Sequence, residues 1–379
     1  MFHQRRLFRH LDVLLLVVVA LLITVGALMV YSSTRAALLA AGKDPLAKVK
    51  LQLVWLLIAL GPLLLAALVD YEKIASLAIP ILGVVMLMLV FVLVISRVLP
   101  EYGMTRGTGR WIDIGPIHLQ PSELAKIAVI LVLASFLAYR EDEVDTLSLV
   151  SRSLLFVAVP AGLVFLQPDL GTTVTLFLIW LTMLFIAGAK LPHLGTYALA
   201  GVLLFAAAWN LGVIRDYQKS RLTVFLHPEE DPTDAGWQLR QSMIAIGSGG
   251  LFGEGRFKGK QTQLNFVPDQ ETDLIFTAVG EEQGFLGCVL VLGLFGGLLW
   301  RTLHIAAVSK DTVGRLIAVG IAALFATHIV VNVGMTIGLM PVKGMPLPFI
   351  SYGGSNLVTN LVCIGLLENI AMRRHKIAF

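Results

Sequence analysis

The chain has 379 residues, of which 57% are hydrophobic and 14% are charged, and its formal net charge is +4. Soluble domains carry roughly 25% charged residues, so this composition excludes a water-soluble fold. The small net charge gives no reason to expect a nucleic-acid partner, because acidic membrane lipids are a sufficient counterpart. Cys288 and Cys363 both fall inside apolar segments, which excludes the disulfide framework of a small secreted protein.

The first apolar segment predicts a transmembrane helix that stays on the chain. Residues 13–31 carry no charge and supply the ~20 residues needed to cross ~30 Å of hydrocarbon. Arg5, Arg6 and Arg9 precede this segment, and no small-residue cleavage site follows a short apolar core. We therefore expect a retained helix rather than a removed signal peptide.

Hydropathy predicts about ten membrane-spanning helices, and hence a single all-α, polytopic membrane domain over residues 1–379. The segments after the first lie at residues 51–69, 74–95, 122–138, 154–166, 171–187, 194–211, 273–300, 316–339 and 357–372. The two short segments on either side of Pro168 can alternatively form a helix pair that meets at a partly re-entrant turn.

The longest polar interruption of the chain, residues 211–272, predicts one large extracytoplasmic loop. Basic residues lie before the first span, between the eighth and ninth, and after the tenth, which predicts that both termini are cytoplasmic and this loop is outside. Four basic residues within residues 32–50 oppose this orientation. Inside the loop, residues 237–246 have apolar side chains near helical spacing and predict an interfacial helix.

A pair of opposite charges interrupts the fourth span. Glu123 and Lys126 are spaced i,i+3, which puts them on one helix face as a potential ion pair. Each charge at bilayer depth costs on the order of 2.5–3.5 kcal/mol, so both must point inward. Two interpretations stay open: a structural pair that fixes helix packing, or a pair that lines a substrate cavity on the face turned toward the eighth span.

Further carboxylates mark the ends of other spans. Asp169, in the sequence Gln-Pro-Asp-Leu-Gly, either presents a carboxylate at a helix break or belongs to a simple turn. Asp273 lies where the long loop meets the eighth span, and a helix cap formed with Thr272 would explain it equally well. Glu281 and Glu282 lie two turns deeper, so they must be paired or hydrated.

Common catalytic and metal-binding motifs are missing from the sequence. There is no H-E-x-x-H, C-x-x-C, G-x-S-x-G or P-loop motif, and the histidines do not cluster at ligand spacing. These absences argue against zinc and phosphoryl-transfer chemistry, and we expect no organic cofactor.

Five longer segments carry a recognisable pattern. They are GRWIDIGPIHLQPSELAKIA at 109–128, QPDLGT at 167–172, IAIGSGGLFGEG at 244–255, NFVPDQETDLIFTAVGEEQGFLG at 265–287 and NVGMTIGLMPVKGMPLPFISYGGS at 332–355. Together they resemble the signatures of the SEDS family, named for shape, elongation, division and sporulation. The resemblance covers nearly the whole chain, and the wording NVGMTIGLMPV and QTQLNFVP is closest to the RodA branch, which serves cell elongation.

This resemblance implies a peptidoglycan glycosyltransferase. Such an enzyme polymerises lipid II on the outer face of the bacterial cytoplasmic membrane and works with a class B penicillin-binding protein. The resemblance also implies that the essential aspartate is the one in the T-D-x-I-F segment, here Asp273. It similarly implicates Glu123, Lys126 and Asp169.

The chemistry of such a transfer indicates which residue types are needed. Because a diphosphate leaves as a stabilised anion, one base and a source of positive charge are sufficient. Asp273 is the candidate base, and an in-line attack would invert the configuration at the sugar. A divalent cation, Mg²⁺ or Mn²⁺, bridging Asp169 or Asp273 is a possible substitute for cationic side chains. The candidate cations for substrate binding are Lys126, Arg110, Arg215, Lys219 and Arg221.

Two other classes of function fit the same features. A lipid-linked precursor flippase or transporter also needs about ten spans and intramembrane charges. A carrier should place its charges near mid-bilayer, whereas Asp273, Asp169, Arg110 and the long loop are predicted on one face. A non-enzymatic scaffold of the wall-synthesis complex predicts instead that these carboxylates are replaceable.

Overall fold

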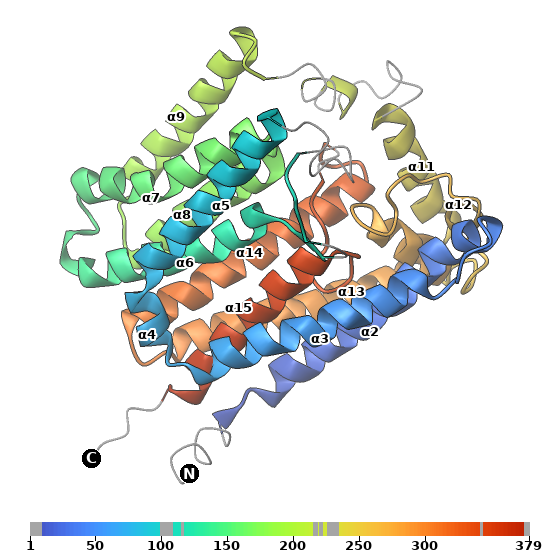
Figure 1. Ribbon diagram of the computed structural model, residues 1–379, viewed down its shortest axis with the longest axis horizontal. Coiled ribbons are helices and arrows are strands. Elements are labelled where there is room, and N and C mark those ends of the chain that lie inside the picture. The colour runs from blue at the N-terminus through green and yellow to red at the C-terminus, as the bar shows by residue number, and fades with distance from the viewer. Residues whose placement is uncertain are drawn as a thin grey trace.

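The computed structural model describes residues 10–98, 109–114, 117–214, 219, 223–225, 235–341 and 344–374. Within these residues, ten helices are long and apolar enough to cross a membrane, and they pack into one bundle (Figure 1). They are α2 (Val13–Ala40), α3 (Ala47–Leu68), α5 (Ala78–Val98), α6 (Pro121–Tyr139), α7 (Leu147–Leu166), α8 (Leu170–Ala187), α9 (Leu191–Asn210), α13 (Ile275–Ala307), α14 (Thr312–Thr336) and α15 (Gly354–Met372). The predicted all-α, multi-pass membrane fold is therefore confirmed.

Shorter elements join or cover these spans. They are α4 (Tyr71–Ser76), η3 (Glu141–Glu143), α11 (Ala235–Ser248), α12 (Lys260–Gln263) and an antiparallel hairpin of β1 (Ile112–Ile114) and β2 (Ile117–Leu119). Helix α11 confirms the helical spacing of residues 237–246, and it packs on α13 and α14 through a face that includes Leu239 and Ala245. Its position at a membrane surface stays a prediction, as does the assignment of residues 211–272 to one outer loop of a single domain.

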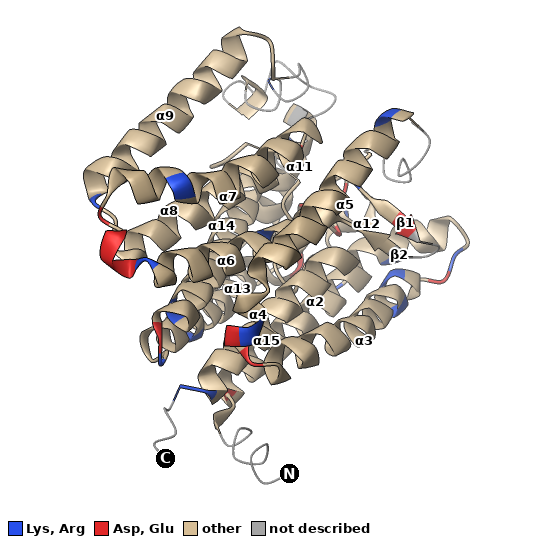
Figure 2. Ribbon diagram, turned by 60° about the vertical axis from the view of Figure 1, so that its left-hand side comes forward, with Lys and Arg blue, Asp and Glu red and all other residues tan. Residues whose placement is uncertain are grey.

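Burial is graded from the centre of the bundle outward. Helices α6, α14 and α15 are mostly buried, whereas α9 is almost entirely exposed. The outer helices α3, α5 and α9 turn leucine and valine side chains outward, which is the surface that a bundle offers to lipid. Charged residues gather mainly near the ends of the helices rather than along their length (Figure 2).

Distant segments of the chain meet at both ends of the bundle. At one end, Asp12 N donates to Glu368 Oε2 at 2.9 Å, which brings the start of α2 against the end of α15. At the other end, three loops meet: the one after β2, the one before α13 and the one before α15. Gln120 N donates to Ser355 Oγ at 3.0 Å, and Tyr352 N donates to Glu271 O at 2.8 Å. These bonds assemble distant segments into one surface.

The two helices that flank Pro168 are both of spanning length, so the re-entrant alternative is wrong. Helix α7 has 20 residues and α8 has 18. The sequence prediction started α7 seven residues too late, because Ser148 and Arg152 lower the local hydropathy. Both side chains are exposed, and the Thr146 hydroxyl caps the helix by accepting from Leu149 N at 3.3 Å.

Helix α13 is broken at Gly284, which adopts φ 66° and ψ −163°. Backbone groups freed at such a break need partners, because unpaired N–H and C=O groups are costly in a membrane. The IGSGGLFGEG segment supplies them. The exchanged bonds run from Phe285 N to Gly250 O (2.8 Å), Leu286 N to Leu251 O (3.1 Å), Glu254 N to Glu281 O (2.9 Å) and Gly255 N to Glu282 O (3.2 Å).

Glu281 and Glu282 are paired with hydrogen-bond donors, as the sequence required. Both side chains are buried on α13. Glu281 accepts from Gln261 N at 2.6 Å and from Thr262 N at 2.9 Å. Glu282 accepts from the Ser32 hydroxyl at 2.5 Å and from Phe257 N at 3.1 Å. These two carboxylates therefore fasten the segment around α12 to the bundle.

Candidate active site

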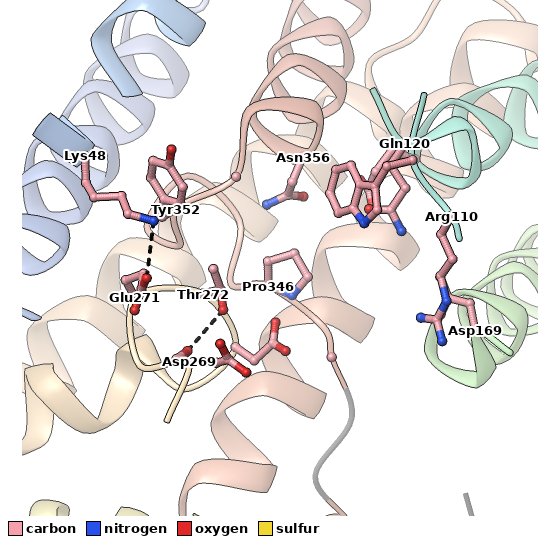
Figure 3. A pocket seen from close by; sticks show the side chains of 15 residues that line it. Lys48, Arg110, Gln120, Asp169, Asp269, Glu271, Thr272, Pro346, Tyr352 and Asn356 are labelled. Atoms are coloured by element: carbon pink, nitrogen blue, oxygen red, sulfur yellow. Dashed lines mark hydrogen bonds and ion pairs between the residues drawn. The ribbon is translucent and has the colours of Figure 1, made fainter. Parts of the chain in front are cut away.

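A cavity of about 500 Å³ lies where these loops meet (Figure 3). Its walls come from the start of α3, the β1–β2 hairpin and α6, the start of α8, the segment before α13 and the loop before α15. The lining residues are Lys48, Arg110, Trp111, Gln120, Glu123, Asp169, Asp269, Glu271, Thr272, Asp273, Gly344, Pro346, Tyr352, Gly353 and Asn356. Four of the sequence-predicted site residues are thus brought together: Asp273, Glu123, Asp169 and Arg110.

Asp273 lies two residues before α13 and is half-buried. Its backbone is fixed from two directions: Asp273 N donates to Asp269 O at 3.1 Å, and Asn332 Nδ2 donates to Asp273 O at 2.8 Å. The buried Asn332 amide also donates to Met345 O at 2.8 Å, which ties the loop before α15 to the same point. A Cβ built at Gly344 would lie 3.1 Å from Asp273 Oδ2, so glycine there lets the loop approach the carboxylate.

The alternative that Asp273 and Thr272 form the N-terminal cap of the eighth span is wrong. Helix α13 begins at Ile275, and its N-terminal boundary residue, Leu274, makes no capping side-chain hydrogen bond. The Thr272 hydroxyl donates to Asp269 O at 3.1 Å instead of accepting from a helix N–H group. Asp273 consequently lies outside the first helical turn, on the pocket wall.

Glu123 and Lys126 form the predicted inward-facing ion pair on α6. Lys126 Nζ donates to Glu123 Oε1 at 2.7 Å, and both side chains are buried. The predicted neighbour is wrong, since the pair faces α14, the ninth span, through His328, whose Nε2 lies 3.2 Å from Lys126 Nζ. Glu123 lines the pocket, and its Oε2 has no hydrogen-bond partner among the described residues. Lys126 lies behind it.

His328 connects this pair to the pocket loop. An ammonium group can only donate, so Nε2 of the imidazole must accept from Lys126. The proton then resides on Nδ1, which lies 3.1 Å from Pro346 O and donates to it. Pro346 lines the pocket, so a chain of hydrogen bonds runs from Glu123 through the buried cation to the loop before α15.

Asp169 serves as the cap of α8 and also lines the pocket. Its two carboxylate oxygens accept from Thr172 N at 3.0 Å and from Thr172 Oγ1 at 2.9 Å. The turn interpretation therefore explains why an aspartate stands here, and Figure 3 shows that its side chain lies beside Arg110. Arg110 Nη2 donates to Pro168 O at 2.5 Å, and its buried Nε has no hydrogen-bond partner within the described residues.

The other predicted cations do not join the pocket in the described part of the chain. Lys219 Nζ lies 5.7 Å from the centroid of the Trp209 ring and is not among the lining residues. Arg215 and Arg221 lie outside the described residues.

Sequence reasoning missed one wall of the pocket. Lys48 Nζ lies 3.6 Å from Glu271 Oε1 and 4.7 Å from the centroid of the Tyr352 ring. From the sequence alone, Lys48 counted only as one of the four basic residues within residues 32–50 that oppose the predicted orientation. Its role in the pocket depends on contacts across more than 200 residues, which no local spacing indicates.

The lining is acidic, with five carboxylates and two cations among the described residues. An anionic substrate is therefore attracted to these two described cations, and a bound counter-ion would add to that attraction. No group of three His, Cys, Asp or Glu side chains that could hold a metal ion is found in the part of the chain that the structure describes.

Comparisons with known proteins agree on one family. A family model described as FTSW_RODA_SPOVE, cell cycle protein, matches residues 12–376. The probable peptidoglycan glycosyltransferase FtsW of Trichlorobacter lovleyi is 38% identical, over 95% of this chain and 93% of its own length. The peptidoglycan glycosyltransferase RodA of Treponema pallidum is 34% identical, over 96% of this chain and 98% of its own.

A solved structure extends the agreement to the fold. It is described as "Structural coordination of polymerization and crosslinking by a peptidoglycan synthase complex", and one of its chains matches with a TM-score of 0.79 and 30% identity. The match covers 97% of this chain and 99% of that one. With the family match over residues 12–376, this chain belongs to the FtsW/RodA/SpoVE family of cell cycle proteins, the SEDS family that its motifs resemble.

Proposed function

We propose that this chain is a peptidoglycan glycosyltransferase that polymerises lipid II into glycan strands during cell elongation. The observation that carries the proposal is the position of Asp273 in a pocket whose wall also holds the cation Arg110. Two relatives that align along almost the whole chain are named peptidoglycan glycosyltransferases. The motifs NVGMTIGLMPV and QTQLNFVP favour the RodA branch over the division branch.

The pocket residues suit transfer from a lipid diphosphate. Asp273 takes the proton of the acceptor 4-hydroxyl while that oxygen attacks the anomeric carbon of the donor sugar. The bond from this carbon to the diphosphate breaks, and Arg110 stabilises the negative charge on the departing group. In-line attack on an α-linked donor gives a β-linked product, so the transfer inverts configuration.

Glu123 contributes a second carboxylate, and the buried Lys126 behind it fixes its position. The buried Lys126 holds one of its oxygens, while Oε2 has no partner among the described residues and is available to a substrate hydroxyl or amide. Because the same cation is linked to Pro346 through His328, the pair also sets the position of the loop that lies against Asp273. We therefore assign a positioning role to Lys126.

We place the pocket on the outer face of the bacterial cytoplasmic membrane and both termini in the cytoplasm. An even number of spans returns the chain to the side on which it began. The contact between Asp12 and Glu368 supports one part of this proposal, that the two termini lie on the same side, at the end of the bundle away from the pocket. A lipid-linked donor would then reach Asp273 with its headgroup at the outer surface.

As a partner we propose a class B penicillin-binding protein, a transpeptidase that would crosslink the new strands. The structure that matches this chain at 30% identity is described as a peptidoglycan synthase complex that coordinates polymerization and crosslinking. That description supports a partner of this kind for the present chain.

We also propose that a divalent cation, Mg²⁺ or Mn²⁺, can be held at Asp273 or Asp169. When bound, it would neutralise charge on the diphosphate, which the acidic lining otherwise repels. Asp169 already accepts two hydrogen bonds from Thr172, which leaves its carboxylate less lone-pair capacity for a cation. The transfer itself requires no organic cofactor.

A polymerisation assay with the purified chain in lipid nanodiscs and lipid II as substrate tests the function. The wild type is expected to form glycan strands, and Asp273→Asn is expected to form none while keeping its thermal unfolding midpoint. Asp44→Asn is the matched control, since it removes one exposed carboxylate outside the pocket. Near-normal strand synthesis by Asp273→Asn would contradict the role as base. Absence of synthesis by the wild type, with and without a class B partner, would contradict the proposed activity.

A further inference from the structure

The two cationic side chains that line the pocket within the described residues lie on opposite sides of it (Figure 3). Arg110 lies beside Asp169, and Lys48 lies across the cavity beside Tyr352 and Glu271. The reaction proposed above uses Arg110 and gives no task to Lys48. Since the other charged lining residues that the structure describes are carboxylates, an anionic group would be attracted to these two positions.

The surroundings of Lys48 hold its ammonium group in place without saturating it. Nζ lies 3.6 Å from Glu271 Oε1, beyond hydrogen-bond length, and 4.7 Å from the centroid of the Tyr352 ring. A cation is attracted to an aromatic face, so the ring orients the side chain. The hydrogen bond from Tyr352 N to Glu271 O, 2.8 Å long, fixes these two partners to each other.

The ammonium therefore has unused binding capacity. It carries three donor hydrogens, and no hydrogen bond to it is found within the described part of the chain. About a third of the side chain is exposed, 36% by area, and the group lines the cavity. A ligand with negatively charged oxygen atoms would find oriented donors at this position.

Polymerisation, on the function proposed above, requires two lipid-linked substrates in the site at once. One diphosphate leaves as the new glycosidic bond forms, and the other stays on the acceptor. Both are anions at headgroup depth, so the site needs two places for them. We propose that Lys48, backed by Tyr352, forms a second anion-binding subsite that holds the diphosphate of one substrate, while Arg110 holds that of the other.

Glu271 distinguishes this role from a purely structural one. A lysine that only braced the loops would need Glu271 as its partner, so loss of either residue would have the same effect. A lysine that binds substrate is instead partly occupied by Glu271 when the subsite is empty. Removing the charge of Glu271 should then tighten binding, whereas removing that of Lys48 should weaken it.

Lipid II binding to the purified chain in nanodiscs tests the subsite, with Asp273→Asn present in every sample to block turnover. Lys48→Gln is expected to weaken binding about ten-fold, as for the loss of one charge-assisted hydrogen bond. Lys48→Arg should retain most of the affinity, and Glu271→Gln should raise it. Lys50→Gln is the matched control, because Lys50 pairs with Asp44 at 2.6 Å and lies outside the pocket.

Equal affinities of the Lys48→Gln and Lys50→Gln proteins would overturn the proposal, and so would weaker binding after Glu271→Gln. Thermal unfolding of each variant checks that the fold is kept. If Lys48→Gln does not fold, the direction of change in Glu271→Gln decides the matter on its own. Because turnover is blocked in these samples, the binding result does not depend on strand synthesis. A wild-type chain that makes no strands would contradict the proposed function, whereas lipid II binding that depends on Lys48 would leave the subsite standing.

A second probe, an isoprenoid diphosphate without sugar, tests whether the diphosphate is the group that Lys48 holds. This molecule carries the diphosphate and the lipid of the substrate but not its sugars. Lys48→Gln should weaken binding of this probe about as much as binding of lipid II. Weaker binding of lipid II alone would overturn the assignment to the diphosphate, and wild-type binding of both molecules would overturn the subsite.

Discussion

Replacing Lys126 by methionine is expected to lower the free energy of unfolding by about 3–5 kcal/mol, because Glu123 is left as an uncompensated buried charge. The Lys126 side chain is 1% exposed and donates to Glu123 Oε1 at 2.7 Å. It also lies 3.2 Å from His328 Nε2, so that acceptor loses its donor as well. An unsatisfied buried acceptor costs ~1–3 kcal/mol by itself, which puts the expected loss toward the upper part of the range.

Titration with a denaturing detergent, followed by circular dichroism, measures this free energy. The matched control is Lys190→Met, since Lys190 pairs with Asp145 at a similar distance, 2.9 Å, with more than half of each side chain exposed. Water screens such a pair, so its loss should change the stability little. Comparable losses in the two variants would refute the argument that burial makes the Lys126 pair critical.

The double variant Glu123→Leu/Lys126→Met separates stability from activity. Replacing a buried ion pair by apolar residues of similar size is often neutral or stabilising, so much of the lost stability should return. Strand synthesis from lipid II should remain absent, because Glu123 lines the pocket. A double variant that is as unstable as Lys126→Met, or one that polymerises normally, would contradict the assigned role of the pair.

Three further outcomes are expected. Gly249→Ala should detach residues 249–264 from α13, since a Cβ at position 249 would lie 1.9 Å from Gly280 O. Faster proteolysis of residues 249–264 than in the wild type would support this expectation, and wild-type resistance to the protease would contradict it. Arg110→Gln should raise the lipid II concentration needed for half-maximal polymerisation, whereas Lys219→Gln, whose ammonium lies over Trp209, should not; equal shifts would count against Arg110 as the diphosphate ligand. EDTA should stop polymerisation and Mg²⁺ or Mn²⁺ should restore it if a divalent cation is held at Asp273, and full activity in EDTA would remove the cation from the mechanism.

Hydropathy was sufficient for the spans because each side chain contributes to lipid solubility almost independently of its neighbours in space. The same independence explains where the prediction was wrong. Ser148 and Arg152 delayed the predicted start of α7, although the helix is capped by Thr146 and begins seven residues earlier than hydropathy indicates. A cap is a hydrogen bond, and a sum over residue hydropathies contains no term for it.

The pocket could be predicted only in part, for a different reason. Glu123 and Lys126 are three residues apart on one helix, so their contact follows from helical geometry alone. Their neighbour His328 and the wall residue Lys48 come from distant segments, and the sequence holds no spacing that pairs them with the site. The bundle has to be assembled before these contacts exist.

Residues at helix starts carry most of the pocket, and membrane physics gives a reason. Irregular backbone is tolerated at membrane depth only where protein or water satisfies its polar groups, so breaks between spans gather at the bundle ends and in protected pockets. Asp169 has both a structural role and a place in the pocket, because its carboxylate caps α8 and also faces the cavity. Asp273 differs: its backbone is held by Asn332 on α14, and its side chain is not required to start α13. Because both oxygens of Asp169 accept hydrogen bonds from Thr172, whereas Asp273 does not cap α13, we propose Asp273 rather than Asp169 as the base.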